Sequence, residues 1–238
     1  RTRLFMTRRL HEHPAILDEK IDAPVIVTGQ GRSGTTILFE LLSQDPTSRS
    51  ISAVDAAHPV PPVNDPERLL AMTECEHELW TDVQPEFATI HEMGAHLPVE
   101  CIHAMMPSFG AFQWWMFADV PDWAPDFVAS MQFHKVFLQM MQFGKPEARW
   151  VLKTPVYLPI LDLVFATYPD AWIVLTHRDP LKTIPSGLST LASCRWHRSD
   201  TVDLDRIRAG GTGIFDLMVH ILDRRKKGEL PDRFVDLH

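Results

Sequence analysis

The segment 25–42, VIVTGQGRSGTTILFELL, constrains the fold more than any other part of the sequence. A short run of Val and Ile enters a turn that contains three glycines, and a helical pattern of apolar residues follows. A strand that leads into a helix in this way is typical of α/β proteins with a parallel sheet. Because the start of a helix presents free amides and the positive end of its dipole, the turn predicts an anion-binding loop.

The rest of the chain supports the same fold class. Three more short apolar segments have the composition of buried strands, namely RWVLKTP, AWIVLTHR and RFVDLH. Helical patterns lie at 35–43, 158–167, 181–192 and 204–227. We therefore predict an α/β fold with a P-loop-like parallel β-sheet flanked by helices.

The stretch 55–144 differs from the rest of the chain. It opens with the proline-rich HPVPPVNDP and continues with helical patterns rich in Met, Phe and Trp. We predict that it is a helical insertion between the first strand–helix unit and the later strands. The whole chain, 1–238, is predicted to be a single domain of ordinary composition, and incomplete at both ends, since it begins with Arg and ends in a strand without a turn.

Charge and cysteine content exclude several classes of protein. The net charge of −8 speaks against binding nucleic acid through a basic surface. Three cysteines at wide spacings do not form a disulfide framework and favour a reducing, cytoplasmic location. No apolar run approaches the roughly 20 residues of a membrane span. His91 and His96 in HEMGAH miss the HExxH spacing, and we expect no metal site.

The glycine turn resembles an ATP-binding loop but lacks its lysine. In the spacing Gly29-x4-Gly34-Thr35-Thr36, a threonine stands where the Walker A lysine would be. The backbone cradle for a phosphate is kept, while the contact to a γ-phosphate is lost and Arg32 supplies positive charge from another position. The residues expected to hold the anion are Gly31, Arg32, Ser33, Gly34, Thr35 and Thr36.

Polar residues also end two of the later strands. Lys153 closes RWVLK, and Arg178 closes AWIVLTHR with Ser186 eight residues further on. Carboxyl ends of parallel strands meet at one edge of a sheet, so we expect these residues beside the glycine turn. The fork of an arginine suits the oxygens of a phosphate.

These two motifs, GRSGTT and HRDPLKTIPS, resemble those of the PAPS-dependent sulfotransferases (PAPS is 3′-phosphoadenosine 5′-phosphosulfate), most of all the bacterial branch. In that family the first motif holds the 5′-phosphosulfate, and the second holds the 3′-phosphate. The resemblance implies that PAPS is the co-substrate without a metal, that Arg178 and Ser186 bind its 3′-phosphate, and that Arg32 and Lys153 neutralise charge on the departing nucleotide.

The general base is less clearly indicated. Cytosolic members of the family have a histidine after Lys-Thr, where this chain has Pro155. Other branches use a glutamate some twenty residues after the basic residue of the loop. Asp55 falls nearest to that position and is our first candidate, followed by His58 and then Glu100.

The sequence favours one type of acceptor and allows two alternative functions. The Met and aromatic content of the insertion, including Trp114 and Trp115, favours a hydrophobic alcohol, such as a lipid or phenol, over a bare sugar. The first alternative is a P-loop nucleotide or small-molecule kinase, against which the missing lysine counts. The second is an inactive nucleotide-binding protein, which Pro155 favours. The sequence does not indicate an oligomeric state.

Overall fold

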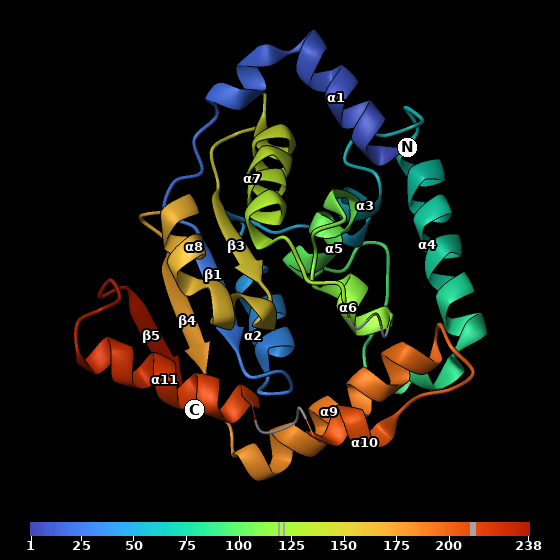
Figure 1. Cartoon of the computed structure of the whole chain (residues 1–238). Coiled ribbons are helices and arrows are strands. Elements are labelled where there is room, and N and C mark those ends of the chain that lie inside the picture. Colours follow the sequence, from blue (N-terminus) through green and yellow to red (C-terminus); the bar gives the residue numbers. More distant parts are fainter. Residues whose placement is uncertain (119, 121, 210–212) are drawn as a thin grey trace.

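The computed structural model describes residues 1–118, 120, 122–209 and 213–238, with the backbone alone at 214. Its centre is a five-stranded sheet in the order β2-β3-β1-β4-β5 (Figure 1), and every neighbouring pair of strands is parallel. The strands are β1 (Val25–Gly29), β2 (Ser48–Arg49), β3 (Arg149–Lys153), β4 (Trp172–Thr176) and β5 (Phe234–Leu237).

The glycine-turn strand, β1, lies at the middle of the sheet. Val25 pairs with Val151 of β3 on one side and with Trp172 of β4 on the other. The four residues that follow the first residue of β1, β3 and β4 are buried in each strand. Continuous burial explains why these segments are uninterrupted runs of Val, Ile and Leu rather than alternating patterns. Since the three strands are parallel, they end at the same edge of the sheet, with Gly29, Lys153 and Thr176 as their last residues.

Helices enclose the sheet and form most of the region between β2 and β3. In Figure 1, the insertion helices α3, α4, α5 and α6 lie on the side of the sheet away from β5 and α11. The α-helices are α1 (Thr2–Glu12), α2 (Thr35–Leu42), α3 (Ala53–Ala57), α4 (Pro66–Val83), α5 (Cys101–Met105), α6 (Gln113–Phe117), α7 (Phe127–Gln142), α8 (Leu161–Thr167), α9 (Pro180–Trp196), α10 (Leu204–Ala209) and α11 (Gly213–Lys226). The 3₁₀ helices are η1 (Pro14–Asp18), η2 (Pro85–Thr89), η3 (Met106–Ser108) and η4 (Pro155–Ile160).

The core joins the insertion to the sheet. Its largest fully buried side chains include Phe137 of α7, Leu152 of β3, and Tyr157 and Tyr168 on either side of α8. Burying such residues removes most of their apolar surface from water, at about 1.5–3 kcal/mol each. One continuous cluster therefore holds α7, α8 and the strands together, and it fixes where the polar ends of the strands lie.

The predicted fold class is confirmed, and three local expectations need correction. The helical pattern at 158–167 begins within the 3₁₀ helix η4, and α8 starts only at Leu161. The pattern at 204–227 is divided between α10 and α11, while residues 210–212 lie outside the described residues. Strand β2 was not expected because two residues are too few to show a periodic pattern. Over the described residues, no helix combines the length and apolarity needed to cross a membrane.

Candidate active site

The turn after β1 has a backbone that requires glycine at two positions. Gly29 has φ +156°, and a Cβ there would lie 2.7 Å from the Thr176 carbonyl oxygen and closer still to its hydroxyl. Gly34 has φ +91° and caps the start of α2 without a side-chain hydrogen bond. The first amides of this eight-residue helix are therefore open to an external anion, as the sequence indicated.

Internal hydrogen bonds hold the turn against β4 and α9. The Ser33 hydroxyl donates to the Gln30 carbonyl at 2.6 Å and shares a 2.6 Å hydrogen bond with the hydroxyl of Thr176. The Thr183 hydroxyl donates to the Gln30 side chain at 3.0 Å. Gln30 and Thr176 were not singled out from the sequence, because their roles depend on which strand lies beside β1.

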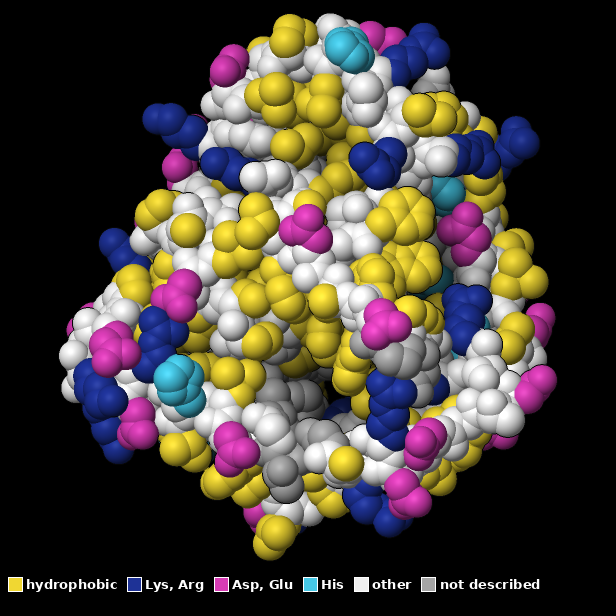
Figure 2. All heavy atoms as spheres, viewed as in Figure 1, with side chains coloured by type: hydrophobic (Ala, Val, Ile, Leu, Met, Phe, Trp, Pro, Cys, Tyr) yellow, Lys and Arg dark blue, Asp and Glu magenta, His cyan; other side chains and the backbone are white. Residues whose placement is uncertain are grey.

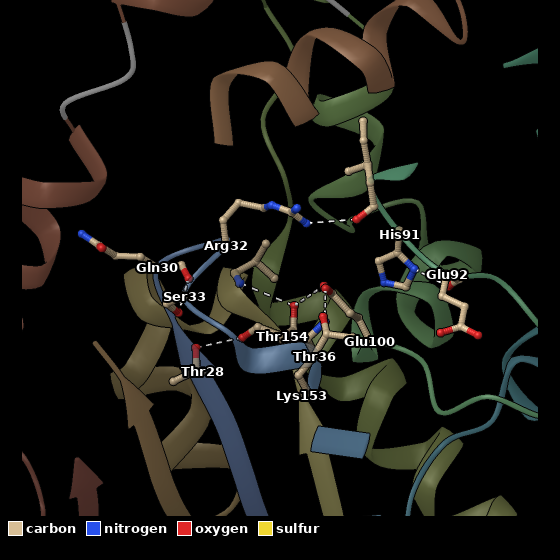
Figure 3. A network of polar contacts seen from close by, with 12 residues as sticks. Thr28, Gln30, Arg32, Ser33, Thr36, His91, Glu92, Glu100, Lys153 and Thr154 are labelled. Carbon is tan, nitrogen blue, oxygen red and sulfur yellow. Dashed lines mark hydrogen bonds and ion pairs between the residues drawn. The ribbon is translucent and has the colours of Figure 1, made fainter. Parts of the chain in front are cut away.

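The two sequence motifs meet at Arg32. Arg178 Nη1 donates to the Arg32 carbonyl oxygen at 2.8 Å, and Arg32 Nε donates to Ser186 Oγ at 3.0 Å. Arg32 also donates from Nη1 to the carbonyl oxygen of Ile90 in the insertion, at 3.1 Å (Figure 3). Arg32 itself has φ +68°, an uncommon conformation for a non-glycine residue and one that clusters at functional sites.

Lys153 and Glu100 form a largely buried ion pair beneath the turn (Figure 3). Lys153 Nζ lies 2.5 Å from Glu100 Oε1 and donates to Thr36 Oγ1 at 3.0 Å. The side chains of Lys153 and Glu100 are 2% and 15% exposed. The Glu100 carboxylate therefore lies beside the start of α2. Glu100 is itself the N-cap residue of α5.

Opposing effects set the ionisation of the site. Desolvation raises the pKa of Glu100, but attraction to Lys153 and its hydrogen bond, with smaller effects of His103 and His91, hold the net pKa below 4.5. Desolvation lowers the pKa of His103 to about 4, although its side chain is accessible to solvent. Glu100 is thus ionised, and His103 neutral, near pH 7.

The first two candidates for the base lie elsewhere. The Asp55 carboxylate accepts hydrogen bonds from the Ser52 amide at 3.1 Å and from its hydroxyl at 2.7 Å, in a capping box at the start of α3. His58 Nε2 lies 3.4 Å from Glu76 Oε2 of α4. Within the described part of the chain, no hydrogen bond or ion pair joins Asp55 or His58 to the glycine turn or Lys153. Glu100, the third candidate, is the one that the structure brings to Lys153.

Other expectations concern cysteines and metals. Cys101 and Cys194 are buried, Cys75 is exposed, and all three are free thiols. Across the described ranges, no group of three or more His, Cys, Asp or Glu side chains is arranged to hold a metal ion. In Figure 2 the surface is hollowed near α6 and α9, and hydrophobic side chains lie along part of the border of this hollow.

The parallel sheet and the glycine turn after β1 define a class of α/β proteins with a P-loop-like turn, here without the Walker lysine. A family model described as "Sulfotransferase family" matches residues 24–238. The chain belongs to this sulfotransferase family, as the sequence motifs indicated.

Solved structures agree with this assignment. The chain is similar to the sulfotransferase STF9 from Mycobacterium avium, with 25% identity, a TM-score of 0.83, and coverage of 99% of this chain and 64% of that one. It is also similar to STF1 from Mycobacterium tuberculosis H37Rv, with 28% identity, a TM-score of 0.75, and coverage of 99% and 67%. The chain thus spans about two thirds of the length of each. No match was found among curated proteins.

Proposed function

We propose that the protein transfers a sulfuryl group from PAPS to a hydroxyl of a hydrophobic small molecule or lipid. The observation that carries this proposal is the meeting of the two motifs at Arg32. Arg178 and Ser186, which resemble the 3′-phosphate site, both hydrogen bond with this residue of the phosphosulfate-type turn. Two anion sites this close suit a nucleotide with phosphate on both its 3′ and 5′ oxygens.

The residues around the turn have chemistry that suits each end of such a donor. The free amides of α2, with the hydroxyls of Thr35 and Thr36, would hold the 5′-phosphosulfate. The guanidinium of Arg178 and the hydroxyl of Ser186 would hold the 3′-phosphate. No metal is part of this proposal, because Arg32 and Lys153 supply the positive charge.

Sulfuryl transfer requires stabilisation of the negative charge that develops on the departing nucleotide. As the acceptor oxygen bonds to sulfur, the bond from sulfur to the bridging oxygen breaks, and negative charge grows on the nucleotide. Lys153 is held 3.0 Å from Thr36 at the start of α2, and Arg32 lies in the turn itself. Cations fixed in advance at this position lower the barrier without reorganising during the reaction.

We propose Glu100 as the general base that takes the proton of the acceptor hydroxyl. Its carboxylate is ionised and lies beside the turn, paired with Lys153, which also contacts Thr36 at the start of α2. Asp55, the first candidate from the sequence, uses its carboxylate in the capping box with Ser52. A base must be within hydrogen-bonding reach of the reacting hydroxyl, and the position of Glu100 fits this requirement better.

The proposal also covers the acceptor, the domain organisation and the cellular location. The hydrophobic border of the hollow in Figure 2 supports an apolar alcohol or phenol. We propose a single sulfotransferase domain with a helical insertion at about 55–144, and a cytoplasmic location without nucleic acid as partner. The oligomeric state is open.

Calorimetry tests the donor before any acceptor is known. PAP, the product nucleotide with 3′- and 5′-phosphates, should bind at least about ten times more tightly than AMP, which lacks the 3′-phosphate. ATP with Mg²⁺ should bind no better than AMP. Tight ATP binding without PAP binding would instead establish the kinase alternative, and PAP binding without transfer to any acceptor would identify an inactive nucleotide-binding protein.

Two carboxylate variants test the base. With 2-naphthol, a phenol that is protonated at neutral pH, as acceptor and PAPS as donor, Glu100→Gln should lower kcat by roughly 10²–10⁴-fold, since general-base catalysis contributes that much, while PAP still binds. Asp55→Asn is the matched control and should keep kcat within about threefold, because a capping change acts on stability. Loss of turnover in Asp55→Asn with normal turnover in Glu100→Gln would reverse the assignment.

A further inference from the structure

A group of buried polar side chains lies behind the Glu100–Lys153 pair, and no step of the proposed reaction uses it. The chain has two tyrosines, Tyr157 in η4 and Tyr168 after α8, and both are fully buried. Both hydroxyls meet the same atom, Nδ1 of His134 in α7, at 3.3 Å for Tyr157 and 2.9 Å for Tyr168. His134 is itself completely buried.

All three groups are neutral at physiological pH. Desolvation lowers the pKa of His134 to about 3 and raises the pKa of both tyrosines well above the ordinary value. The other ring nitrogen of His134, Nε2, is buried and has no hydrogen-bond partner among the described residues. An unsatisfied buried polar atom costs about 1–3 kcal/mol, so this arrangement is not what stability alone would favour.

Cys101 connects this group to the ion pair. Cys101 directly follows Glu100 as the first residue of α5 and is completely buried. Burial raises the pKa of its thiol to about 12, and hydrogen bonding to the Lys153 backbone and to the Tyr157 side chain partly offsets this rise. The thiol and the Tyr157 ring belong to the same buried core cluster.

The position of Tyr157 in the chain makes the connection direct. Thr154 caps η4, where its hydroxyl accepts from the Val156 amide, and Tyr157 follows one residue later. The same Thr154 hydroxyl donates to Glu100 Oε2 at 3.5 Å, so the start of η4 contacts the Glu100 carboxylate as well as following the end of β3. A shift of the Tyr157 ring would therefore be passed to Glu100 through Thr154. Tyr168 contacts the same nitrogen of His134 from the end of α8 and has no described hydrogen bond to β3 or α5.

We propose that Tyr157, supported by His134 and Cys101, is a positioning residue that holds the Glu100 carboxylate on Lys153 and so aims the base at the acceptor. This inference rests on the proposed function, in which Glu100 is the base. Groups that support a reactive side chain from behind fix its orientation, and their loss lowers activity without removing any contact to substrate.

The two tyrosines provide a matched pair of variants. Tyr157→Phe and Tyr168→Phe each delete one hydroxyl from the same histidine nitrogen. The first readout is the titration of Glu100 in protein labelled with ¹³C at the glutamate carboxyl, with the Glu100 signal identified by its absence from Glu100→Gln. The groups facing this carboxylate, namely Lys153, His103 and His91, are unchanged in both variants.

In Tyr157→Phe the pKa of Glu100 should rise by about one unit or more, because burial persists while the ammonium is held less closely. Tyr168→Phe should leave it near the wild-type value. An unchanged Glu100 titration in Tyr157→Phe, or an equal shift in Tyr168→Phe, would overturn the proposal. If Tyr157→Phe does not fold, Cys101→Ala takes its place in the test and removes the thiol that supports Tyr157. A raised pKa of Glu100 in Cys101→Ala would then support the proposal, and an unchanged Glu100 titration would overturn it.

Kinetics provide a second readout that separates this proposal from the proposed function. With 2-naphthol and PAPS, Tyr157→Phe should lower kcat about 10-fold and leave the Kd for PAP unchanged, whereas Tyr168→Phe should keep kcat within about twofold. Absence of PAP binding in the wild type would refute the proposed function, and the Glu100 titration would still decide the role of Tyr157.

Discussion

Replacing Lys153 with Met should reverse the direction in which Glu100 makes the free energy of unfolding depend on pH. The change keeps an unbranched side chain of similar length and removes the ammonium, which lies 2.5 Å from the carboxylate. Removing one partner of a buried pair costs about 3–5 kcal/mol, because the other charge is left without compensation. Since Glu100 is 15% exposed and Thr36 also loses its donor, we expect a loss of about 3 kcal/mol at pH 7.

The pH dependence has a defined sign. In the wild type the folded pKa of Glu100 lies below 4.5, so its contribution to stability is present above that pH and is lost as pH falls through the folded pKa. In Lys153→Met desolvation acts without the ammonium and raises the folded pKa above 4.5. The variant is then relatively most stable at low pH, and it loses stability as pH rises through the raised pKa.

The measurement is urea unfolding of the wild type, Lys153→Met and Lys153→Met/Glu100→Gln at several pH values from 4.5 to 7.5. Subtracting the wild-type free energy of unfolding at each pH cancels the groups that titrate equally in all three proteins. The deficit of Lys153→Met should grow from about 1 to about 3 kcal/mol as pH rises. The double variant, which has no buried charge at the pair, should show a deficit of about 1 kcal/mol that hardly changes with pH.

Two outcomes would refute the reasoning. A deficit of Lys153→Met that is the same at every pH would mean that Glu100 is not desolvated in the folded protein. Equal stability of the single and double variants at pH 7 would mean that the carboxylate is not left uncompensated when the ammonium is removed.

The remaining predictions concern the turn and the nucleotide. Gly29→Ala should lower the free energy of unfolding by roughly 2–4 kcal/mol, because its Cβ would overlap Thr176 and the turn cannot move from β4. Thermal unfolding measures this, and a Tm within about 2 °C of the wild type would contradict it. Arg178→Lys should weaken PAP binding about tenfold in calorimetry and leave AMP binding nearly unchanged, since only the 3′-phosphate loses the arginine fork. Equal losses for PAP and AMP would instead assign Arg178 to the 5′-phosphate or to support of the turn.

Local sequence patterns predicted the central part of the fold well. The runs that became β1, β3 and β4 are buried on both faces, so their apolar residues are continuous and easy to recognise. The start of α2 was also predictable, because a glycine turn followed by a helical pattern needs no distant contact to form. Strand β2 lacked any such signal, since its two residues are defined only by pairing with β3.

The sequence by itself determined the order of the two predicted anion motifs. Each motif follows a buried strand, and each can be recognised from residues that are adjacent in the sequence. Parallel strands then had to bring Arg32 and Arg178 to one edge of the sheet. Which carboxylate reaches Lys153 was decided only by tertiary packing. Glu100 is 53 residues from Lys153, and it arrives there because α5, which follows it, packs on α7 and α3. Asp55 stood at a more suggestive position in the sequence, but its own capping box holds it at α3. Spacing along the chain cannot encode that outcome, because the path of an insertion is fixed by the apolar surfaces that it buries.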